Sequence, residues 1–327
     1  SNALTLHEAW AFEPDDVLLH ALPIFHVHGL FVALHTALLN GSKMIWLPRF
    51  DAEQVCDLLP RVSVLMGVPT FYTRLLGLPA FTQEACRNMR LFVAGSAPLL
   101  AETHDTFAAR TGHRILERYG MTEAGMVTSN PYDGARLAGT VGYALPGIDV
   151  RVRAESGDRL ADVDTVGVLE FKGPNVFSGY WRNPEKTAED FTADGYFISG
   201  DLATIAQDGR VSIVGRSKDL IISGGFNVYP KEIETALNAI PGVDESAVIG
   251  VPHPDFGEGV VAVITRDKAA AESPDEAAIM AALSDQLAKF KQPKRVFTVD
   301  ALPRNAMGKV QKNTLRETHA TLFKPGT

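Results

Sequence analysis

The first 117 residues alternate short apolar runs with longer segments whose apolar residues recur at helical spacing. We expect strands at residues 17–22, 43–47, 62–66, 91–94 and 114–117. We expect helices at residues 30–39, 51–59, 69–76 and 99–110. Asp51 is a favourable N-cap, Pro69 suits a first helical turn, and Gly112 suits a helix C-terminus. This alternation predicts a mostly parallel sheet with helices on its faces.

The pattern changes near Gly139, where short strands separated by Gly, Asp and Pro begin to dominate. We expect these strands at residues 149–153, 167–172, 196–198, 202–205 and 210–214. Between the last two, the sequence AQDG at 206–209 is typical of a hairpin turn. This part is therefore expected to be antiparallel, as a small β-barrel or a sheet.

A third pattern follows Arg216. We expect strands at residues 219–222, 243–251, 260–265 and 296–299, and helices at 230–240 and 274–290. Apolar Ile279, Leu283 and Leu287 recur at four-residue steps, which indicates an amphipathic helix. The fold class predicted is α/β, with three parts. These are a partial parallel-sheet α/β subdomain at 1–138, a small β-barrel-like subdomain at 139–216, and a compact α+β domain at 217–327.

Composition and charge narrow the class of protein. Of the 327 residues, 46% are hydrophobic and 21% are charged, which excludes a disordered or fibrous chain. Asp and Glu number 39 against 31 Lys and Arg, and the net charge of −8 argues against nucleic-acid binding through bulk charge. The two cysteines, Cys56 and Cys86, cannot form a disulfide framework, and no basic leader precedes an apolar run at the start. We therefore expect a cytoplasmic location.

One apolar stretch, residues 17–39, is long enough to span a membrane. It carries four histidines, with Pro23 and Gly29 near its middle, and polar groups at membrane depth are costly. A buried strand, a turn and a buried helix is the better interpretation, so no membrane span is expected.

Five segments combine glycine with chemically active side chains. They are residues 95–98 (GSAP), 119–123 (YGMTE), 200–201 (GD), 215–226 (GRSKDLIISGGF) and 303–309 (PRNAMGK). An aromatic ring, a hydroxyl and a carboxylate within five residues could stack a base, bond a phosphate and hold Mg²⁺. A lysine on a glycine-bearing loop can reach a phosphate. Taken singly, each segment also fits an ordinary turn, a charged linker or a surface lysine.

In this order and spacing, the five segments resemble the adenylate-forming superfamily of acyl-CoA synthetases, luciferases and peptide-synthetase adenylation domains. The resemblance covers nearly the whole chain and implies an acetyl-CoA synthetase-like fold. It also implies an ATP-dependent carboxylic acid–CoA ligase of fatty acid metabolism. Such an enzyme acts through an acyl-adenylate, releases AMP and pyrophosphate, and uses ATP, Mg²⁺ and coenzyme A.

The resemblance implies roles for residues of the nucleotide site. Tyr119 would stack on adenine, Thr122 would bond the phosphate, and Glu123 would hold Mg²⁺. Asp201 and Arg216 would bind the ribose. Further nucleotide-binding residues implied are Gly95, Ser96, Ala97, Glu117 and Gly120.

Other roles implied by the resemblance concern catalysis and domain motion. Lys218 would be the hinge of the C-terminal domain, and Lys309 would be the catalytic lysine of adenylation. His26 would gate the acyl pocket. The channel for the pantetheine arm of CoA would be lined by Gly224, Gly225 and Phe226.

A finer resemblance is to malonyl-CoA synthetases, carried by residues 21–30, 67–74, 116–120 and 128–134. A second carboxylate on the substrate requires a cation, and arginine holds carboxylates bidentately. Arg74 and Arg118 are the candidates, although each could instead pair with a surface acid. The pair Ala124-Gly125 departs from the malonate-specific pattern, which leaves the acid, malonate or methylmalonate, open.

A second departure concerns phosphate binding. The superfamily carries a Ser/Thr/Gly-rich loop followed by Lys, and no such loop precedes His26. We therefore expect an N-terminally truncated fragment that is inactive alone, since backbone cradling of pyrophosphate would be lost. Two alternatives stay open: an adenylation domain that serves a carrier protein, and a non-catalytic fragment that binds AMP or CoA. The expected partners are a small carboxylic acid, ATP and CoA, and the oligomeric state is open.

Overall fold

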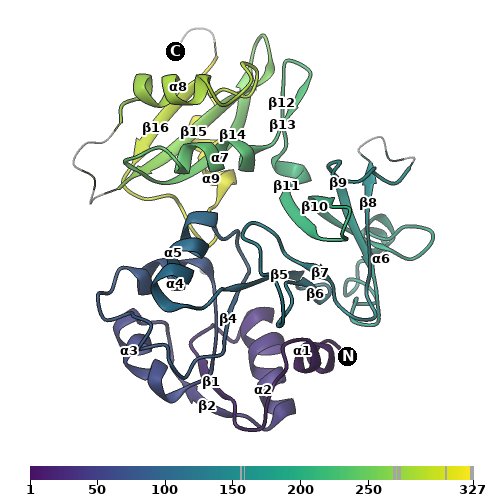
Figure 1. The fold of residues 1–327 in the computed structure, drawn as a ribbon. Helices are drawn as coiled ribbons and strands as arrows, with labels where there is room; N and C mark the ends of the chain where they lie inside the picture. Colours follow the sequence, from purple (N-terminus) through teal and green to yellow (C-terminus); the bar gives the residue numbers. More distant parts are fainter. Residues whose placement is uncertain (155–156, 158, 268–269, 271–273, 306–307, 325–327) are drawn as a thin grey trace. The chain divides into compact units, whose positions relative to one another are not determined.

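The chain folds into two compact units (Figure 1). One unit holds residues 1–199 and 203–213, and the other holds 200–202 and 214–327. The structure, a computed structural model, describes residues 1–154, 157, 159–267, 270, 274–305 and 308–324. The division of the first unit at residue 139 stays a prediction.

The first unit is built on a seven-stranded sheet of order β2-β1-β3-β4-β5-β6-β7. Its strands are β1 (Val17–His20), β2 (Lys43–Trp46), β3 (Val64–Gly67), β4 (Leu91–Ala94), β5 (Leu116–Met121), β6 (Gly125–Ser129) and β7 (Tyr143–Ala144). Neighbours from β2 to β5 pair in parallel, and β5, β6 and β7 pair antiparallel. The predicted parallel sheet is confirmed, and β6 and β7 extend it.

Helix α1 (Asn2–Ala9) precedes the first strand, and helical segments connect the parallel strands. The connecting segments are a π-helical segment (His28–Leu34), α2 (His35–Asn40), α3 (Ala52–Leu58), a 3-10 turn (Leu59–Arg61), α4 (Pro69–Leu76) and α5 (Ala101–Thr111). The predicted caps are confirmed, because Asp51 accepts a bond from the Gln54 amide and Gly112 takes a left-handed φ of 77°. The sequence did not indicate α1. None of the described helices is both long enough and apolar enough to cross a membrane.

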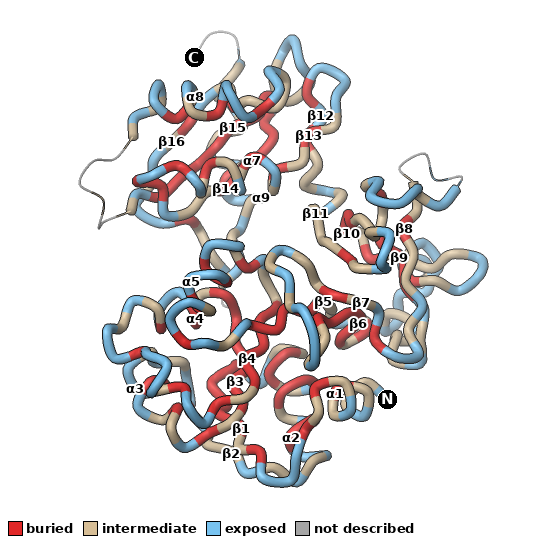
Figure 2. Tube along the Cα trace, in the orientation of Figure 1, coloured by how far each residue is buried: buried red, intermediate tan, exposed pale blue. Residues whose placement is uncertain are grey.

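The core of this unit surrounds the middle strands, and all residues of β3 and β4 are buried (Figure 2). Strands covered on both faces are near-continuous apolar runs, which the sequence of both strands shows. On one side, Phe107 of α5 packs against the rings of Tyr72, Phe81 and Phe92, with centroids 4.9–5.5 Å apart. Phe107 is fully buried.

A second, antiparallel sheet has the order β11-β10-β9-β8. Its strands are β8 (Asp149–Ala154), β9 (Gly167–Lys172), β10 (Phe197–Ile205) and β11 (Val211–Arg216), and α6 (Pro184–Glu189) lies between β9 and β10 in sequence. The strands expected at 196–198 and 202–205 are one strand, β10. The barrel is not seen among the described residues, because β8 and β11 are the two ends of the sheet and do not pair with each other.

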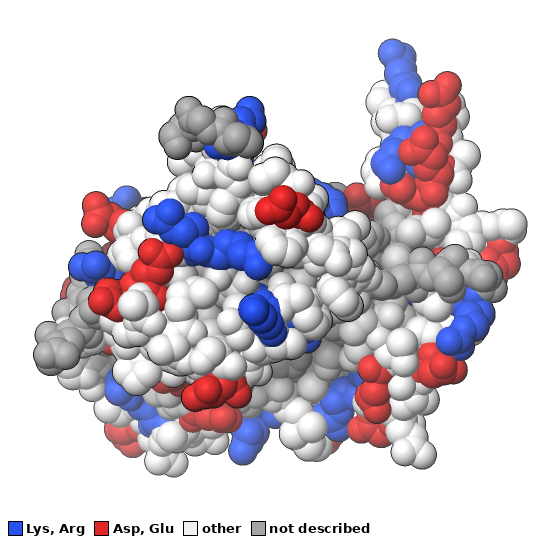
Figure 3. Space-filling model, turned by 90° about the horizontal axis from the view of Figure 1, so that it is seen from above, with Lys and Arg blue, Asp and Glu red and all other residues white. Residues whose placement is uncertain are grey.

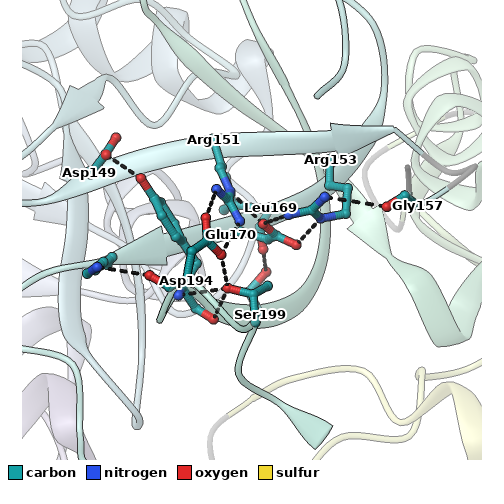
Figure 4. A network of polar contacts seen from close by, with 11 residues as sticks. Asp149, Arg151, Arg153, Gly157, Leu169, Glu170, Asp194 and Ser199 are labelled. Atoms are coloured by element: carbon teal, nitrogen blue, oxygen red, sulfur yellow. Dashed lines mark hydrogen bonds and ion pairs between the residues drawn. The ribbon is translucent and has the colours of Figure 1, made fainter. Parts of the chain in front are cut away.

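A charged network crosses β8 and β9 of this sheet (Figure 4). Arg151 lies directly opposite Glu170, and Arg151 Nε donates to Glu170 Oε2 at 2.7 Å. Arg153 Nε donates to Glu170 Oε1 at 2.6 Å. Arg151 also forms a bidentate pair with Asp194, which holds the pKa of that carboxyl below its usual range. Glu170, 1% exposed, is therefore balanced by two guanidinium groups.

The second unit contains a sheet of order β13-β12-β15-β14, in which β16 pairs in parallel with β15. Its elements are β12 (Ile221–Ser223), β13 (Phe226–Val228), α7 (Pro230–Asn238), β14 (Val243–His253), β15 (Gly257–Arg266), α8 (Glu276–Ser284), β16 (Arg295–Val299) and α9 (Lys312–His319). Successive strand residues face opposite sides. Val260 therefore packs with the α7 and α8 cluster, and Val261 packs with Leu315 of α9.

The helix expected at 274–290 ends at Ser284 in the structure. The Ser284 hydroxyl donates to the Ala281 carbonyl, and such side-chain bonds compete with the helical ladder. Leu287 still reaches the core beyond the helix. The spacing of apolar residues therefore predicted correctly that Leu287 is buried, but it predicted a helix longer than α8.

Acidic and basic side chains are interspersed over the face seen in Figure 3. The whole chain has a net charge of −8, and the acidic side chains on the face shown are not gathered into one patch.

Phe107→Ala is expected to lower the free energy of unfolding of the first unit by about 3–5 kcal/mol, because the change leaves a cavity among aromatic rings. Urea unfolding followed by the fluorescence of buried Trp10 measures this loss. Thr106→Ala, at an exposed position of the same helix, should leave the midpoint nearly unchanged. Equal midpoints for the two variants would contradict the packing described.

Glu170→Gln should destabilise the antiparallel sheet by about 2 kcal/mol, because two guanidinium groups lose a shared carboxylate. Hydrogen exchange at the amides of β8 and β9 measures the loss. Asp194→Asn, whose side chain is 57% exposed, should have a much smaller effect. Unchanged exchange in Glu170→Gln would show that the network does not stabilise the sheet.

Candidate functional site

The candidate site of the first unit lies where the parallel strands end. Gly67 is level with Ala94, and Ala94 is level with Glu117, so the residues that follow meet at one edge of the sheet. Open α/β sheets bind ligands outside the carboxyl ends of their strands. Gly95 and Arg118 lie at this edge.

Arg118 is buried at this edge, with 4% exposure. Its Nε and Nη2 atoms have no hydrogen-bond partner among the described residues. Burial lowers the pKa of Arg118 to about 9, so the side chain stays cationic at neutral pH. The nearby Tyr72 hydroxyl donates to the Val93 carbonyl at 2.6 Å. A buried cation without an acid partner is costly and marks a place prepared for an anion.

Small and neutral groups surround this guanidinium. A Cβ on Gly95 would lie 2.2 Å from Arg118 Nη1, so only glycine leaves room. Ser96 takes a left-handed φ of 71°, and its Oγ lies 3.3 Å from His28 Nδ1. His28 is fully buried, and burial together with the Arg118 charge holds its pKa well below the usual range. We call Tyr72, Gly95, Ser96, His28 and Arg118 the Arg118 cluster.

The segment 119–123 lies where β5 turns into β6. Tyr119, Gly120 and Met121 lie within β5, and Thr122 and Glu123 form the turn. The sequence placed the whole motif after a strand, and the structure continues the strand through its first three residues. A Cβ on Gly120 would lie 2.1 Å from the Gly125 carbonyl oxygen, which explains the glycine. Thr122 is exposed and Glu123 is half-buried.

A loop between β9 and α6 holds this turn, and the sequence analysis did not single it out. The Asn175 side chain donates to the Ala124 carbonyl at 2.6 Å, and the Phe177 amide donates to the Glu123 carbonyl at 2.8 Å. Tyr180 Oη donates to Glu123 Oε1 at 3.2 Å. No local signal links residues so far apart in sequence. The pair Asn183-Pro184, which is typical of a helix start, is the local sequence signal in this region, and α6 begins there.

Other predicted residues of this unit are placed as follows. Glu117 is buried, and its Oε1 accepts from the Gly139 amide at 3.2 Å. His26 Nδ1 accepts from the His28 amide at 3.2 Å, which links His26 to the Arg118 cluster. Ala97 follows Ser96 in the turn after β4 and is half-buried. Arg74 is exposed on α4, and its role in the substrate site stays a prediction.

In the second unit, Asp201 and Arg216 are brought together. Asp201 is 5% exposed, and its Oδ1 accepts from Arg216 Nε at 2.8 Å. Gly200, with φ of 69°, precedes the carboxylate. Lys218 is exposed in a 3-10 turn (Ser217–Asp219) that follows Arg216 directly. The pair offers a carboxylate and a guanidinium on adjacent strands.

Two consecutive glycines form the turn between β12 and β13. Gly224 and Gly225 have φ of 60° and 81°, a conformation that side chains disfavour. The next residue, Phe226, is 55% exposed and stacks on Phe290 with centroids 4.7 Å apart. The turn therefore presents bare backbone beside an exposed aromatic ring.

Lys309 is exposed on the loop before α9. Its amide donates to Asn305 Oδ1, and its carbonyl accepts from the Asn305 amide, each at 3.0 Å. Ala306 and Met307 of the predicted motif lie outside the described residues. Within the part of the chain that is described, no three His, Cys, Asp or Glu side chains gather as a metal site.

Family comparison agrees with these features. Residues 1–181 match the model of the AMP-binding enzyme family, and residues 232–309 match the AMP-binding enzyme C-terminal domain. A malonate–CoA ligase of Arabidopsis thaliana is 39% identical over 97% of this chain and 56% of its own length. The mitochondrial malonate–CoA ligase of Homo sapiens is 38% identical over 94% of this chain and 59% of its own length.

Among solved structures, ATP-bound MatB from Rhodopseudomonas palustris is similar to this chain with a TM-score of 0.96 and 60% identity. The alignment covers 99% of this chain and 64% of that one. The chain thus spans less than two thirds of the length of these relatives. Since the family model matches more than half of its residues, the chain belongs to the AMP-binding enzyme family.

Proposed function

We propose that the complete protein is an ATP-dependent carboxylic acid–CoA ligase that converts malonate or methylmalonate to its CoA thioester. The buried, unpartnered guanidinium of Arg118 is the observation that carries the substrate assignment. The names of the two malonate–CoA ligases above support the reaction class.

The substrate assignment follows from charge. One carboxylate of a dicarboxylate reacts with the nucleotide, and the other must be bound elsewhere, which we assign to the Arg118 cluster. Arg118 has two nitrogen atoms without partners, which suits a bidentate pair with a carboxylate. His28 Nε2, also buried without a partner, adds a second polar atom close by. A monocarboxylate such as butyrate would leave the cation uncompensated.

Two bonds form and two break in the proposed reaction. A substrate carboxylate oxygen attacks the α-phosphate of ATP and pyrophosphate leaves. The thiol of CoA gives its proton to solvent, its sulfur attacks the acyl carbonyl, and AMP leaves. Lys309 would stabilise charge on the α-phosphate in the first step. Gly224, Gly225 and Phe226 would line the path of the pantetheine arm in the second, and Lys218 would be the hinge between them.

The nucleotide would be held by the remaining predicted residues. Tyr119 would stack on adenine beside the bare backbone of Gly120, and Thr122 would bond a phosphate. Asp201 and Arg216 would hold the ribose hydroxyls. His26 would gate the acyl pocket from its position beside His28.

Glu123 suits Mg²⁺ in two respects. Its carboxylate is half-buried, and no Lys or Arg among the described residues forms an ion pair with it. Magnesium binds hard oxygen ligands through one or two carboxylates together with substrate phosphates. When bound, the ion would supply positive charge to the phosphates. Glu123 would hold it at the β5–β6 turn.

Arg118→Met in the complete protein should reduce kcat/KM for malonate about 100-fold, because a buried charge pair with the substrate is lost. Butyrate turnover, measured as AMP release with ATP, CoA and Mg²⁺, should change little. Arg61→Met, at an exposed position in the Leu59–Arg61 turn, is the matched control. An equal loss for both acids, or none for malonate, would remove the dicarboxylate assignment.

Gly95→Ala should perturb the same guanidinium without changing its charge, because the added Cβ would overlap Arg118. We expect malonate KM to rise while butyrate kinetics stay near those of the wild type. If the substitution weakened both acids equally, Gly95 would serve the nucleotide and not the acyl pocket.

A further inference from the structure

The Tyr180 hydroxyl lies between two carboxylates. It is 3.2 Å from Glu123 Oε1 and 3.1 Å from Asp190 Oδ2. A phenol carries one proton, so it can donate to only one of the two at a time. The contact therefore links the turn that carries Glu123 to α6, which ends just before Asp190.

The two carboxylates differ in how their charge is balanced. Asp190 Oδ1 accepts from Lys186 Nζ at 2.8 Å, one helical turn away. Glu123 has no such cation among the described residues, and the phenol is its one side-chain donor there. Because Lys186 already balances the charge of Asp190, Glu123 gains more from the phenol proton. Donation to Glu123 Oε1 then fixes the side chain of Glu123.

The backbone of the turn is held separately. Asn175 and Phe177 bond the Ala124 and Glu123 carbonyls without help from Tyr180. The Tyr180 amide donates to Thr187 Oγ1 at 2.9 Å, and its ring meets the edge of Phe177 with centroids 4.8 Å apart. Removal of the hydroxyl alone would leave all these contacts in place.

We propose that Tyr180 is a positioning residue for Glu123, which it holds in one rotamer, ready to bind the divalent cation that accompanies ATP. The inference rests on the proposed function in one respect, the role of Glu123 as a cation ligand. A free glutamate side chain must be ordered when it binds a cation, and Tyr180 removes that entropic cost in advance.

The test is Tyr180→Phe in the complete protein. Binding of a non-hydrolysable ATP analogue is measured by calorimetry, once with Mn²⁺ and once in EDTA, without acid or CoA. The Kd of the Mn²⁺–nucleotide complex should rise about 10-fold, the cost of ordering one glutamate side chain. The Kd in EDTA should stay within about twofold, because the turn keeps its backbone bonds.

Two further variants separate the possible failures. Asp190→Asn places an amide N–H donor beside the phenol oxygen, which leaves the phenol proton for Glu123, so Mn²⁺-dependent binding should be retained. Glu123→Gln should abolish the Mn²⁺ effect, and if it does not, the proposed cation role of Glu123 is wrong. If Glu123→Gln acts as expected but Tyr180→Phe binds like the wild type, the positioning role alone is wrong. Equal weakening with and without Mn²⁺ would also overturn it, since that result indicates structural damage.

Discussion

The structure of the candidate pocket depends on one buried cation. Arg118 carries its charge inside the protein without a neighbouring acid, so every group packed against it must tolerate that charge. Position 95 is a glycine, since a Cβ there would overlap the guanidinium. The pKa of His28 is held well below its usual range, so His28 is neutral. The Tyr72 hydroxyl donates to a backbone carbonyl. These three features look unrelated in sequence. All three lie around one guanidinium at the carboxyl edge of a parallel sheet.

Strand β5 connects this pocket to the proposed nucleotide site. It pairs in parallel with β4 on one side and antiparallel with β6 on the other. The parallel side brings Arg118 beside Gly95, and the antiparallel side creates the turn that carries Glu123. One short strand therefore sets the spacing between the proposed acyl site and the proposed cation ligand. Asn175, Phe177 and Tyr180 then hold the turn from outside the sheet.

Local chemistry in the sequence predicted the parallel sheet well. Asp51, Pro69 and Gly112 each affect the backbone within a few residues of their own position. A short stretch of sequence is therefore enough to place these helix ends. The barrel is not seen among the described residues, and its closure would depend on pairing between distant strands, which a short window of sequence does not report. The helix expected at 274–290 ends at Ser284, although apolar residues continue at helical spacing to Leu287. Arg118 was a candidate from sequence, but its burial and Tyr180 are properties of contacts across the fold.

The unpartnered guanidinium of Arg118 also affects the free energy of folding. Exchange of a buried charge for a neutral residue of similar volume often stabilises a protein, because desolvation outweighs what the charge gains. A protein selected for thermal tolerance alone would therefore tend to lose Arg118. A carboxylate bound as proposed would supply the negative charge that the buried guanidinium lacks, and its binding would stabilise the folded protein. The proposed substrate would then complete the charge balance of the protein interior.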